Sequence, residues 1–488
     1  MDHSHAPVLE ALAAYHDSGQ TPFTPPGHKQ GRGADPRVRD TLGADVFRTD
    51  VLAISGLDDR ASSGGVLARA QALMADAVGA EHTFFSTCGS SLSIKAAILS
   101  VAGPHEKLLV GRDVHKSVVS GLVLAGIRPI WIDPQWDTTH HLAHPPAAEA
   151  FAAAFAEHPD ARGALVTSPT PYGTCADLTE IARVCHDHGR PVVVDEAWGA
   201  HLPFHPRLPT WAMDSGADLC VTSVHKMGSG LEQGSVFHLQ GELIDPTVLK
   251  AREDLLGTTS PSVLVYAALD GWRRQMVEHG RALFDDALAL AASVRSRLGA
   301  IDGLRVHGRE DFCGPGRATD LDPLQVVVDV SALGTTGYRV TDWVRRHHQV
   351  NLHLTDHRRI NAQLTHADDE DTAGRLLAAI EDVSAHAEDL RPAPAVEIPS
   401  PAALRLEQVM LPRDAHFGRA EQVPWREAAG RISAEMLTPY PPGIPAALPG
   451  ERLDSEVLRY LRSGVAAGMV VPDAADPEVA SVRVAVED

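Results

Sequence analysis

Cysteine is scarce in this chain, with five residues among 488. The five are odd in number and scattered, and no two have the Cys-x-x-Cys spacing. Disulfide frameworks need paired cysteines, and zinc knuckles need closely spaced ones. The sequence therefore predicts neither feature.

Positive charge is also in deficit. The chain has 43 Lys and Arg against 64 Asp and Glu, which gives a formal net charge of −21. Proteins bind nucleic acid largely through Lys and Arg that neutralise phosphates. We therefore expect no nucleic-acid partner, whereas an acidic chain is compatible with a cationic ligand.

Long hydrophobic runs are missing as well. No window holds the roughly 20 apolar residues that a membrane-spanning helix needs. The N-terminal residues MDHSHAPVLEALAAYHDSG lack the basic start and apolar core of a secretory signal. The sequence thus predicts no membrane partner, and the cytoplasm is the expected location.

The remaining composition is globular, with 44% hydrophobic and 22% charged residues. The length allows two to four domains. Changes in pattern predict an N-terminal arm without strong periodicity, a large domain, a small domain and, after a linker rich in Pro and Ala, a C-terminal domain. These four segments are residues 1–60, 61–275, 276–392 and 404–488.

The large domain alternates short, uniformly apolar runs with helix-like runs. This alternation is typical of a mostly parallel sheet buried on both faces, and it predicts an α/β fold. The expected helices are 67–80, 117–126 and 178–189, and the expected strands are 107–113, 128–133, 164–171, 191–197 and 218–223. The small domain alternates helices with strands, including a strand at 324–330.

Ligands of such sheets bind beyond the carboxyl ends of the strands. A carboxylate, two histidines, several hydroxyls and a lysine follow the predicted strands, so we expect them to meet at one rim. They are Asp113, His115, Ser168, Thr170, Asp195, Ala197, Ser223, His225 and Lys226.

A phosphate site is predicted where Cys88-Gly89-Ser90-Ser91 leads into a helix-like run. The start of a helix offers free N–H groups to a phosphate, and serine hydroxyls add donors. Asp195 ends a buried strand, and Lys226 follows 226 − 195 = 31 residues later. A phosphate site, an aspartate and a lysine are together typical of a pyridoxal phosphate (PLP) site.

The chain resembles the Orn/Lys/Arg decarboxylases of the aspartate-aminotransferase fold (fold type I), in particular their short forms. The resemblance rests on collinear segments over most of the chain. They include TPFTPPGHKQGRG (21–33), CGSSLSIKAAI (88–98), GRDVHKSVVSGL (111–122), VVVDEAWGAHLPFH (192–205), SVHKMGSGLEQGS (223–235) and TPYPPGIPAALPGE (438–451). The resemblance implies a seven-stranded-type sheet in a large domain, a smaller α+β domain, a C-terminal domain and a homodimer or higher homo-oligomer.

The resemblance also implies residue roles. Lys226 would bind PLP covalently with His225 beside it, Asp195 would hold the pyridine nitrogen, and Ala197 and His115 would lie on the two ring faces. Ser90, Ser91 and Ser223 would contact the phosphate, and Thr258, Thr259 and Ser260 match a segment near the cofactor. Two positions depart from the family: Trp198 replaces a histidine, and CGSS replaces NGTS or NGTT.

The implied activity is decarboxylation of a basic amino acid, with arginine ahead of lysine and ornithine, to CO2 and an amine that is a polyamine precursor. Either Lys226 or His225 would reprotonate the α-carbon. The substrate's distal cation requires a carboxylate, and Glu435 and Glu451 are the first candidates.

Two other functions remain open: an aminotransferase or carbon–carbon lyase on the same fold, and a non-catalytic PLP-binding regulator. Arg112 is the only arginine after the predicted rim strands, which favours loss of the α-carboxylate over transamination. Histidines at 140, 141 and 144 and at 347, 348, 353 and 357 suggest metal binding, but their spacing is irregular and lacks flanking cysteines. We expect no metal site.

Overall fold

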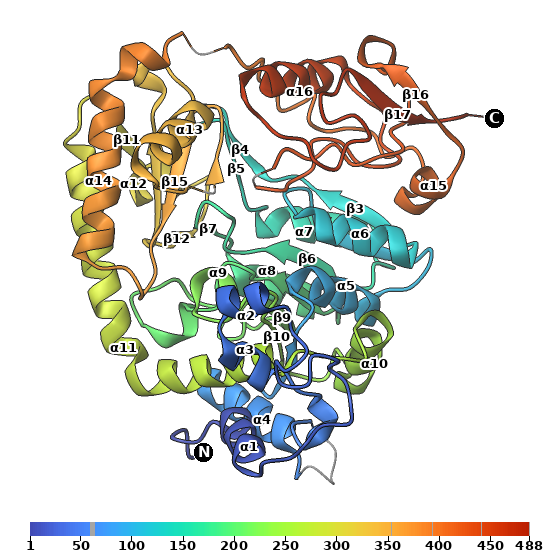
Figure 1. Cartoon of the computed structure of the whole chain (residues 1–488). Coiled ribbons are helices and arrows are strands. Elements are labelled where there is room, and N and C mark those ends of the chain that lie inside the picture. Colours follow the sequence, from blue (N-terminus) through green and yellow to red (C-terminus); the bar gives the residue numbers. More distant parts are fainter. Residues whose placement is uncertain (59–63, 353, 393, 441, 488) are drawn as a thin grey trace. The chain divides into compact units, whose positions relative to one another are not determined.

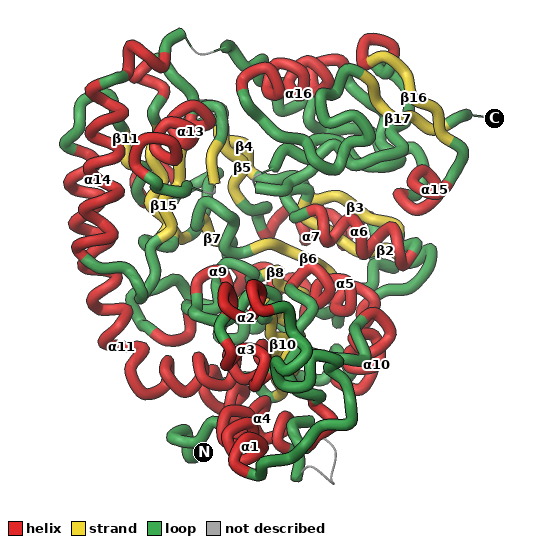
Figure 2. The backbone as a smooth tube through the Cα atoms, viewed as in Figure 1, coloured by secondary structure: helices red, strands yellow, loops and turns green. Residues whose placement is uncertain are grey.

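The structure is a computed structural model, which describes residues 1–58, 64–352, 354–392, 394–440 and 442–487. His353 and Pro441, which belong to motifs named above, lie outside these residues. The chain divides into two compact units. The first comprises Met1–Ser100 and Val193–Phe284, and the second comprises Val101–Val192 and Asp285–Asp488. Figure 1 identifies the elements by label, and Figure 2 separates helices from strands.

The N-terminal arm is more regular than predicted. It contains α1 (Pro7–Asp17), α2 (Pro36–Leu42), α3 (Ala44–Thr49) and the 3-10 turn η1 (Ala53–Ser55). Helices α1 and α2 begin with proline, which suits the first helical turn. The Asp270 carboxylate accepts a hydrogen bond from the Val8 amide of α1 at 2.8 Å. The same carboxylate forms a buried ion pair with Arg273 at 3.0 Å, so this pair anchors the start of α1.

Four strands of the first unit run in the order β1 (His82–Ser86), β10 (Ser235–Leu239), β9 (Leu219–Ser223) and β8 (Val192–Asp195). Strands β8 and β9 are parallel, whereas β10 is antiparallel to both β9 and β1. The same unit contains α4 (Val66–Val78), α9 (Val224–Met227), η3 (Leu202–Phe204) and α10 (Pro246–Leu256), and α5 (Ser90–Val101) begins in it.

Three strands of the second unit run in the order β6 (Ala164–Thr167), β2 (Lys107–Gly111) and β3 (Arg128–Ile132), all parallel. Helices α6 (Lys116–Ala125), α7 (Ala148–Glu157) and α8 (Leu178–Asp187) alternate with them. Two short strand pairs complete this part of the chain. They are the antiparallel pair β4 (Gln135–Asp137) with β5 (Leu142–His144), and the pair β7 (Thr174–Cys175) with β12 (Asp320–Leu321).

A second, antiparallel sheet has the order β11 (Arg305–Val306), β13 (Gln325–Asp329), β15 (Arg359–Gln363) and β14 (Leu354–Thr355). Its chain segment includes α12 (Arg309–Phe312), η4 (Ser331–Leu333), α13 (Gly337–His348), α14 (Glu370–Ala385) and η5 (Ala387–Leu390). The 37-residue helix α11 (Val263–Gly299) runs through the predicted domain boundary at 275/276.

The C-terminal segment has its own hydrophobic core, which includes Leu437, Leu458, Leu461, Val471 and Val482. Its elements are α15 (Pro412–Phe417), β16 (Ala420–Pro424), η6 (Trp425–Glu427), α16 (Ser455–Ala467) and β17 (Ser481–Ala485). Asp454 caps α16 by accepting a bond from the Glu456 amide at 2.6 Å.

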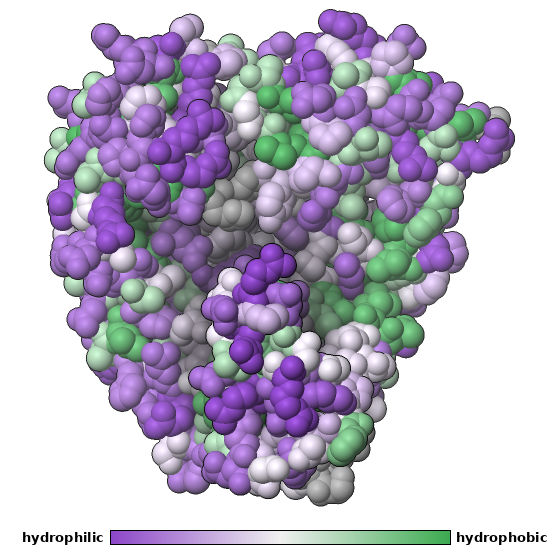
Figure 3. All heavy atoms as spheres, in the orientation of Figure 1, coloured by the Kyte–Doolittle hydropathy of each residue, from purple (hydrophilic) through white to green (hydrophobic). Residues whose placement is uncertain are grey.

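The predicted helices and strands of the large domain are confirmed, with ends shifted by a few residues. Strands β1 and β10 were not predicted. No described helix has the length and apolar character that crossing a bilayer requires. The face drawn in Figure 3 is mostly hydrophilic, with hydrophobic residues in smaller patches.

Candidate active site

The predicted phosphate site lies at the start of α5. Gly89, which precedes the helix, has φ +76°, and its amide donates to the Gln233 carbonyl at 2.9 Å. The hydroxyl of Ser223, at the end of β9, donates to the Ser90 hydroxyl at 2.6 Å. Two hydroxyls from distant sequence positions therefore meet at a helix N-terminus, where the helix dipole favours an anion.

Asp195 is the last residue of β8 and is buried, because Val192, Val193 and Val194 before it form a wholly apolar strand. Its carboxylate accepts one hydrogen bond, from the Ala197 amide at 3.3 Å. Burial raises the pKa of Asp195, and the nearby Lys226 charge opposes that shift. A cationic partner would stabilise this carboxylate.

Lys226 lies in the single-turn helix α9, directly after β9. Burial of the amine lowers the pKa of Lys226, and Asp195 acts in the opposite direction. Its Nζ lies 4.5 Å from the centroid of the Trp198 ring, so the residue that departs from the family pattern contacts the lysine. At Gly228 a Cβ would lie 2.7 Å from the Trp272 ring, which explains the lack of side-chain bulk beside the lysine.

His225 precedes the lysine, and its Nδ1 lies 3.2 Å from the carbonyl oxygen of Gly234. A carbonyl only accepts, so Nδ1 carries the proton in this bond. Burial lowers the pKa of His225. The imidazole is therefore neutral at neutral pH, with its lone pair on Nε2.

His115 belongs to the second unit, where it caps α6. Its Nδ1 accepts a bond from the Ser117 amide at 3.2 Å. The Lys116 amide donates to the carbonyl of Gly443 at 2.9 Å, and a Cβ at Gly443 would lie 2.9 Å from the His115 ring. Two of the quoted sequence motifs thus contact each other and fix this ring. Its place against a cofactor stays a prediction.

A cavity of about 430 Å3 lies in the second unit at the carboxyl ends of β2 and β6. Asp113 and Thr170, which follow these strands, line it together with Trp136 and Tyr172. The Asp113 carboxylate is buried and has no hydrogen bond from any described residue. Burial raises its pKa to about 7.

The predicted partners of a substrate cation have other contacts. Glu451 is fully buried and accepts two bonds from Arg112, at 3.0 and 3.1 Å. The Glu435 carboxylate accepts bonds from the amides of Ala475 and Arg483, both at 2.6 Å. These contacts give both acids a structural role in the C-terminal segment, and a role in substrate binding stays a prediction.

Sequence reasoning missed one acidic group beside the site. Glu196 is fully buried, and it accepts bonds from the Cys220 thiol and the Ala212 amide at 3.1 Å each. Burial raises its pKa to about 8, so this acid is mainly protonated at pH 7. The segment Thr258–Ser260 is exposed in the single chain, and its predicted approach to a partner subunit's cofactor stays a prediction.

Comparison with known proteins identifies the family. Residues 6–311 match the Orn/Lys/Arg decarboxylase major domain, and residues 402–473 match the C-terminal domain of the same family. The chain belongs to the Orn/Lys/Arg decarboxylase family. The predicted resemblance is therefore confirmed, and with it the assignment as a decarboxylase.

Individual family members match over nearly their whole length. An arginine decarboxylase of Bacillus anthracis is 37% identical over 481 residues, which are 98% of this chain and 97% of the relative. An arginine decarboxylase of Bacillus subtilis is 36% identical over 485 residues, which are 99% and 98%. The solved Escherichia coli constitutive lysine decarboxylase has a TM-score of 0.83 at 20% identity, covering 99% of this chain and 82% of that one. This likeness confirms the predicted fold class.

The residues of the first unit fit the PLP that this family implies. A buried carboxylate, Asp195, suits a protonated pyridine nitrogen, and the half-buried amine of Lys226, whose pKa is lowered, suits a carbonyl carbon. The hydroxyls of Ser90 and Ser223 at the start of α5 suit a phosphate. This set of donors and acceptors matches the three polar ends of the cofactor.

Proposed function

We propose that this decarboxylase uses PLP bound at Lys226 and acts on arginine in preference to lysine and ornithine. The observation that carries the cofactor assignment is a pair of opposite charges at the ends of two adjacent parallel strands, of which Asp195 is buried and Lys226 is half-buried. Asp195 ends β8, and Lys226 follows β9 by three residues. PLP, when bound, supplies an electron sink for the bond that breaks at the α-carbon.

Asp195 would hold the proton on the pyridine nitrogen. Its carboxylate has one backbone hydrogen bond, so it can accept another from the ring N–H. An added cationic partner would offset the burial that raises its pKa. Ala197 would lie against one face of the ring and His115 against the other.

Lys226 would act as nucleophile and proton carrier. Burial lowers the pKa of its amine, which increases the neutral, nucleophilic fraction. The Trp198 ring favours the protonated form through a cation–π contact and would orient the chain when the amine is charged. His225 would donate or accept a proton at Nε2, because its Nδ1 is held by the Gly234 carbonyl.

The choice of reaction is supported by Arg112. It is the only arginine that follows a predicted rim strand. Its side chain forms an ion pair with Glu451 and donates a hydrogen bond to the carbonyl of Pro445 at 2.8 Å. An arginine engaged in this way does not hold a substrate carboxylate, and a decarboxylase must leave that group free to depart. Arginine as substrate is supported by arginine decarboxylases at 36–37% identity.

We further propose a cytoplasmic homodimer. The support is the family resemblance and the exposed segment Thr258–Ser260, which matches a family segment near the cofactor. Sedimentation velocity of the PLP-loaded protein measures the assembly, and a monomer at micromolar concentration would exclude it.

The function is tested with the purified protein, PLP and a panel of amino acids. Release of CO2 and formation of the amine and keto acid are measured for arginine, lysine, ornithine, one neutral and one acidic amino acid. We expect CO2 and amine in equal amounts, fastest from arginine. CO2 from only the neutral or acidic substrate would overturn the substrate class, and keto acid without CO2 would favour the aminotransferase.

A further inference from the structure

A buried group of histidines and aspartates lies in the second unit, and none of its members is assigned to PLP. His140, on the loop between β4 and β5, lies near His307, which follows β11, and Asp311 in α12. All three residues are buried. One ligand atom from each lies within 4.8 Å of the other two. Sequence spacing did not reveal this group, because His140 and His307 are 167 positions apart.

Both imidazoles face the same carboxylate. His140 Nε2 lies 3.9 Å from Asp311 Oδ1, and His307 Nδ1 lies 3.2 Å from Asp311 Oδ2. Ligand atoms bound tetrahedrally to zinc at about 2.1 Å lie about 3.4 Å from one another. The two nitrogen–oxygen separations, 3.2 and 3.9 Å, lie on either side of that value. Side-chain movement would have to bring the three ligand atoms, now within 4.8 Å of one another, to that spacing.

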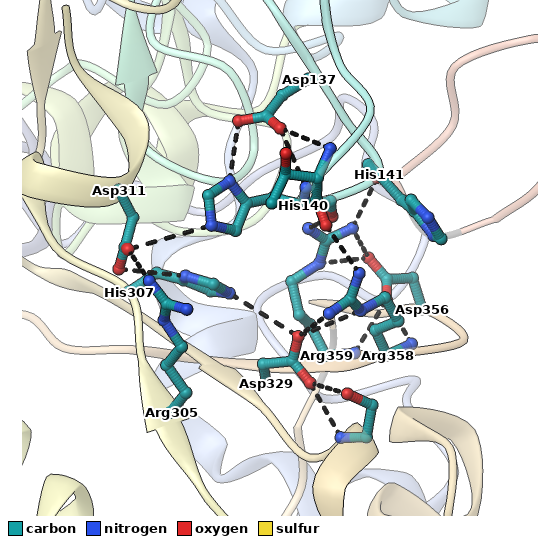
Figure 4. Close-up of polar contacts among 12 residues, drawn as sticks. Asp137, His140, His141, Arg305, His307, Asp311, Asp329, Asp356, Arg358 and Arg359 are labelled. Atoms are coloured by element: carbon teal, nitrogen blue, oxygen red, sulfur yellow. Dashed lines mark hydrogen bonds and ion pairs between the residues drawn. The ribbon is translucent and has the colours of Figure 1, made fainter.

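The outer nitrogen of each imidazole faces a second carboxylate. His140 Nδ1 is 2.7 Å from Asp137 Oδ2, and His307 Nε2 is 3.9 Å from Asp329 Oδ2. Figure 4 shows His140 between Asp137 and Asp311, and His307 between Asp311 and Asp329. His140 has the arrangement of a metal-bound histidine, in which an outer carboxylate fixes the tautomer and makes the other nitrogen a better ligand. The 3.9 Å separation at His307 is longer than a hydrogen bond.

A further histidine beside the group lacks hydrogen bonds. His144, at the end of β5, is fully buried, and neither ring nitrogen bonds a described residue. Its Nε2 lies 3.6 Å from Asp137 Oδ2, the atom that faces His140. His140 and His144 therefore share the Asp137 carboxylate at the edge of the group.

We propose that His140, His307 and Asp311 form a binding site for a divalent transition-metal ion of the zinc class, with the fourth position open to water. Two nitrogens and one carboxylate oxygen are donors that such ions prefer. The ion would join the β4–β5 hairpin to α12. It would compete with Arg305, whose exposed guanidinium forms an ion pair with Asp311.

The alternative is a hydrogen-bonded network that needs no ion, with Arg305 supplying the positive charge. Zinc binding by the PLP-loaded protein distinguishes the two. After chelation and dialysis, the protein is equilibrated with zinc chloride, and bound metal per chain is measured by elemental analysis. We expect one ion per chain and a rise in melting temperature. No uptake by the wild type would overturn the site.

Variants locate the ion. His140→Ala and His307→Ala should each weaken zinc binding at least a hundredfold. His141→Ala is the matched control, because His141 is the next residue of the same loop and stacks on His357 instead. Equal binding in all four proteins would place the zinc elsewhere and contradict the proposal.

A variant outside the buried group keeps the test valid if the histidine variants do not fold. The Arg305 side chain is 62% exposed, so Arg305→Ala should fold. Loss of the competing cation should tighten zinc binding at least threefold. Unchanged or weaker binding would show that the zinc does not use Asp311 and would overturn the site.

Discussion

The hydroxyl of Ser223 donates a hydrogen bond of 2.6 Å to the hydroxyl of Ser90, although the two residues are 133 positions apart. Ser90 begins α5, and Ser223 ends β9, three residues before Lys226. The contact brings the predicted phosphate site at Ser90 next to the end of β9, the strand that leads to Lys226. It therefore links two parts of the site that the sequence offered separately.

Loss of either hydroxyl should weaken PLP binding. Ser90→Ala and Ser223→Ala each remove a donor to the phosphate, and a hydrogen bond to a charged group contributes about 1.5–3 kcal/mol. The dissociation constant for PLP should rise about tenfold to a hundredfold. Ser100→Ala, at the other end of α5, is the control, since its hydroxyl donates a hydrogen bond to the Ala97 carbonyl of the same helix. Titration of the apoprotein with PLP measures the effect, and equal affinities for all variants would remove these hydroxyls from the phosphate site.

Asp195→Asn should leave PLP bound and lower turnover by about three orders of magnitude, since each factor of ten costs 1.36 kcal/mol in the barrier. An amide cannot keep the pyridine nitrogen protonated. The adjacent Glu196→Gln is the control, because Glu196 faces Cys220 and Ala212 and is mainly protonated at pH 7. The measurement is the rate of CO2 release at saturating arginine. Turnover of Asp195→Asn within threefold of wild type would show that another group protonates the ring.

Glu196 should also make stability depend on pH. Its pKa is raised from 4.5 to about 8 in the folded chain, so between these values the folded protein retains a proton that the unfolded chain loses. This contribution to stability is complete below about pH 4.5 and falls as the pH rises toward 8. The denaturation midpoint should therefore fall less between pH 5.5 and 8 in Glu196→Gln than in the wild type. An equal fall of the denaturation midpoint with pH in the two proteins would contradict the raised pKa of Glu196.

The Arg112–Glu451 pair should be structural. Removal of one partner from a buried ion pair costs about 3–5 kcal/mol, so Glu451→Ala should lower the melting temperature by several degrees. Glu407→Ala, which removes an exposed partner of Arg452, is the control and should cost less than about 1 kcal/mol. An unchanged melting temperature with a raised Michaelis constant for arginine would instead support the predicted role of Glu451 in substrate binding.

Sequence pattern located much of the fold. The strands β2, β3, β6, β8 and β9 were predictable because each is a short apolar run. Strands β1 and β10 were missed because His82, Ser86, Ser235 and His238 interrupt their apolar character, and these strands gain stability from pairing with each other. The three helices of the arm were missed because they are short or weakly periodic.

Site residues could be predicted only where a strand end or a motif marked them. Asp195 and Lys226 follow predicted strands, so local pattern sufficed to propose them. The bonds of Arg112 to Glu451 and the approach of His140 to His307 join positions far apart, and one sequence does not encode such pairings locally. Burial, which shifts the pKa of Glu196 and Asp113, also requires the folded chain.

Reductive labelling of the PLP-loaded protein tests the central claim most directly. Borohydride fixes PLP to the lysine that binds it, and peptide mapping by mass spectrometry then identifies that residue. We predict one label per chain, on Lys226, and no label in Lys226→Ala. A label on Lys95, Lys107 or Lys116, or full labelling of Lys226→Ala, would contradict the assignment of the active site.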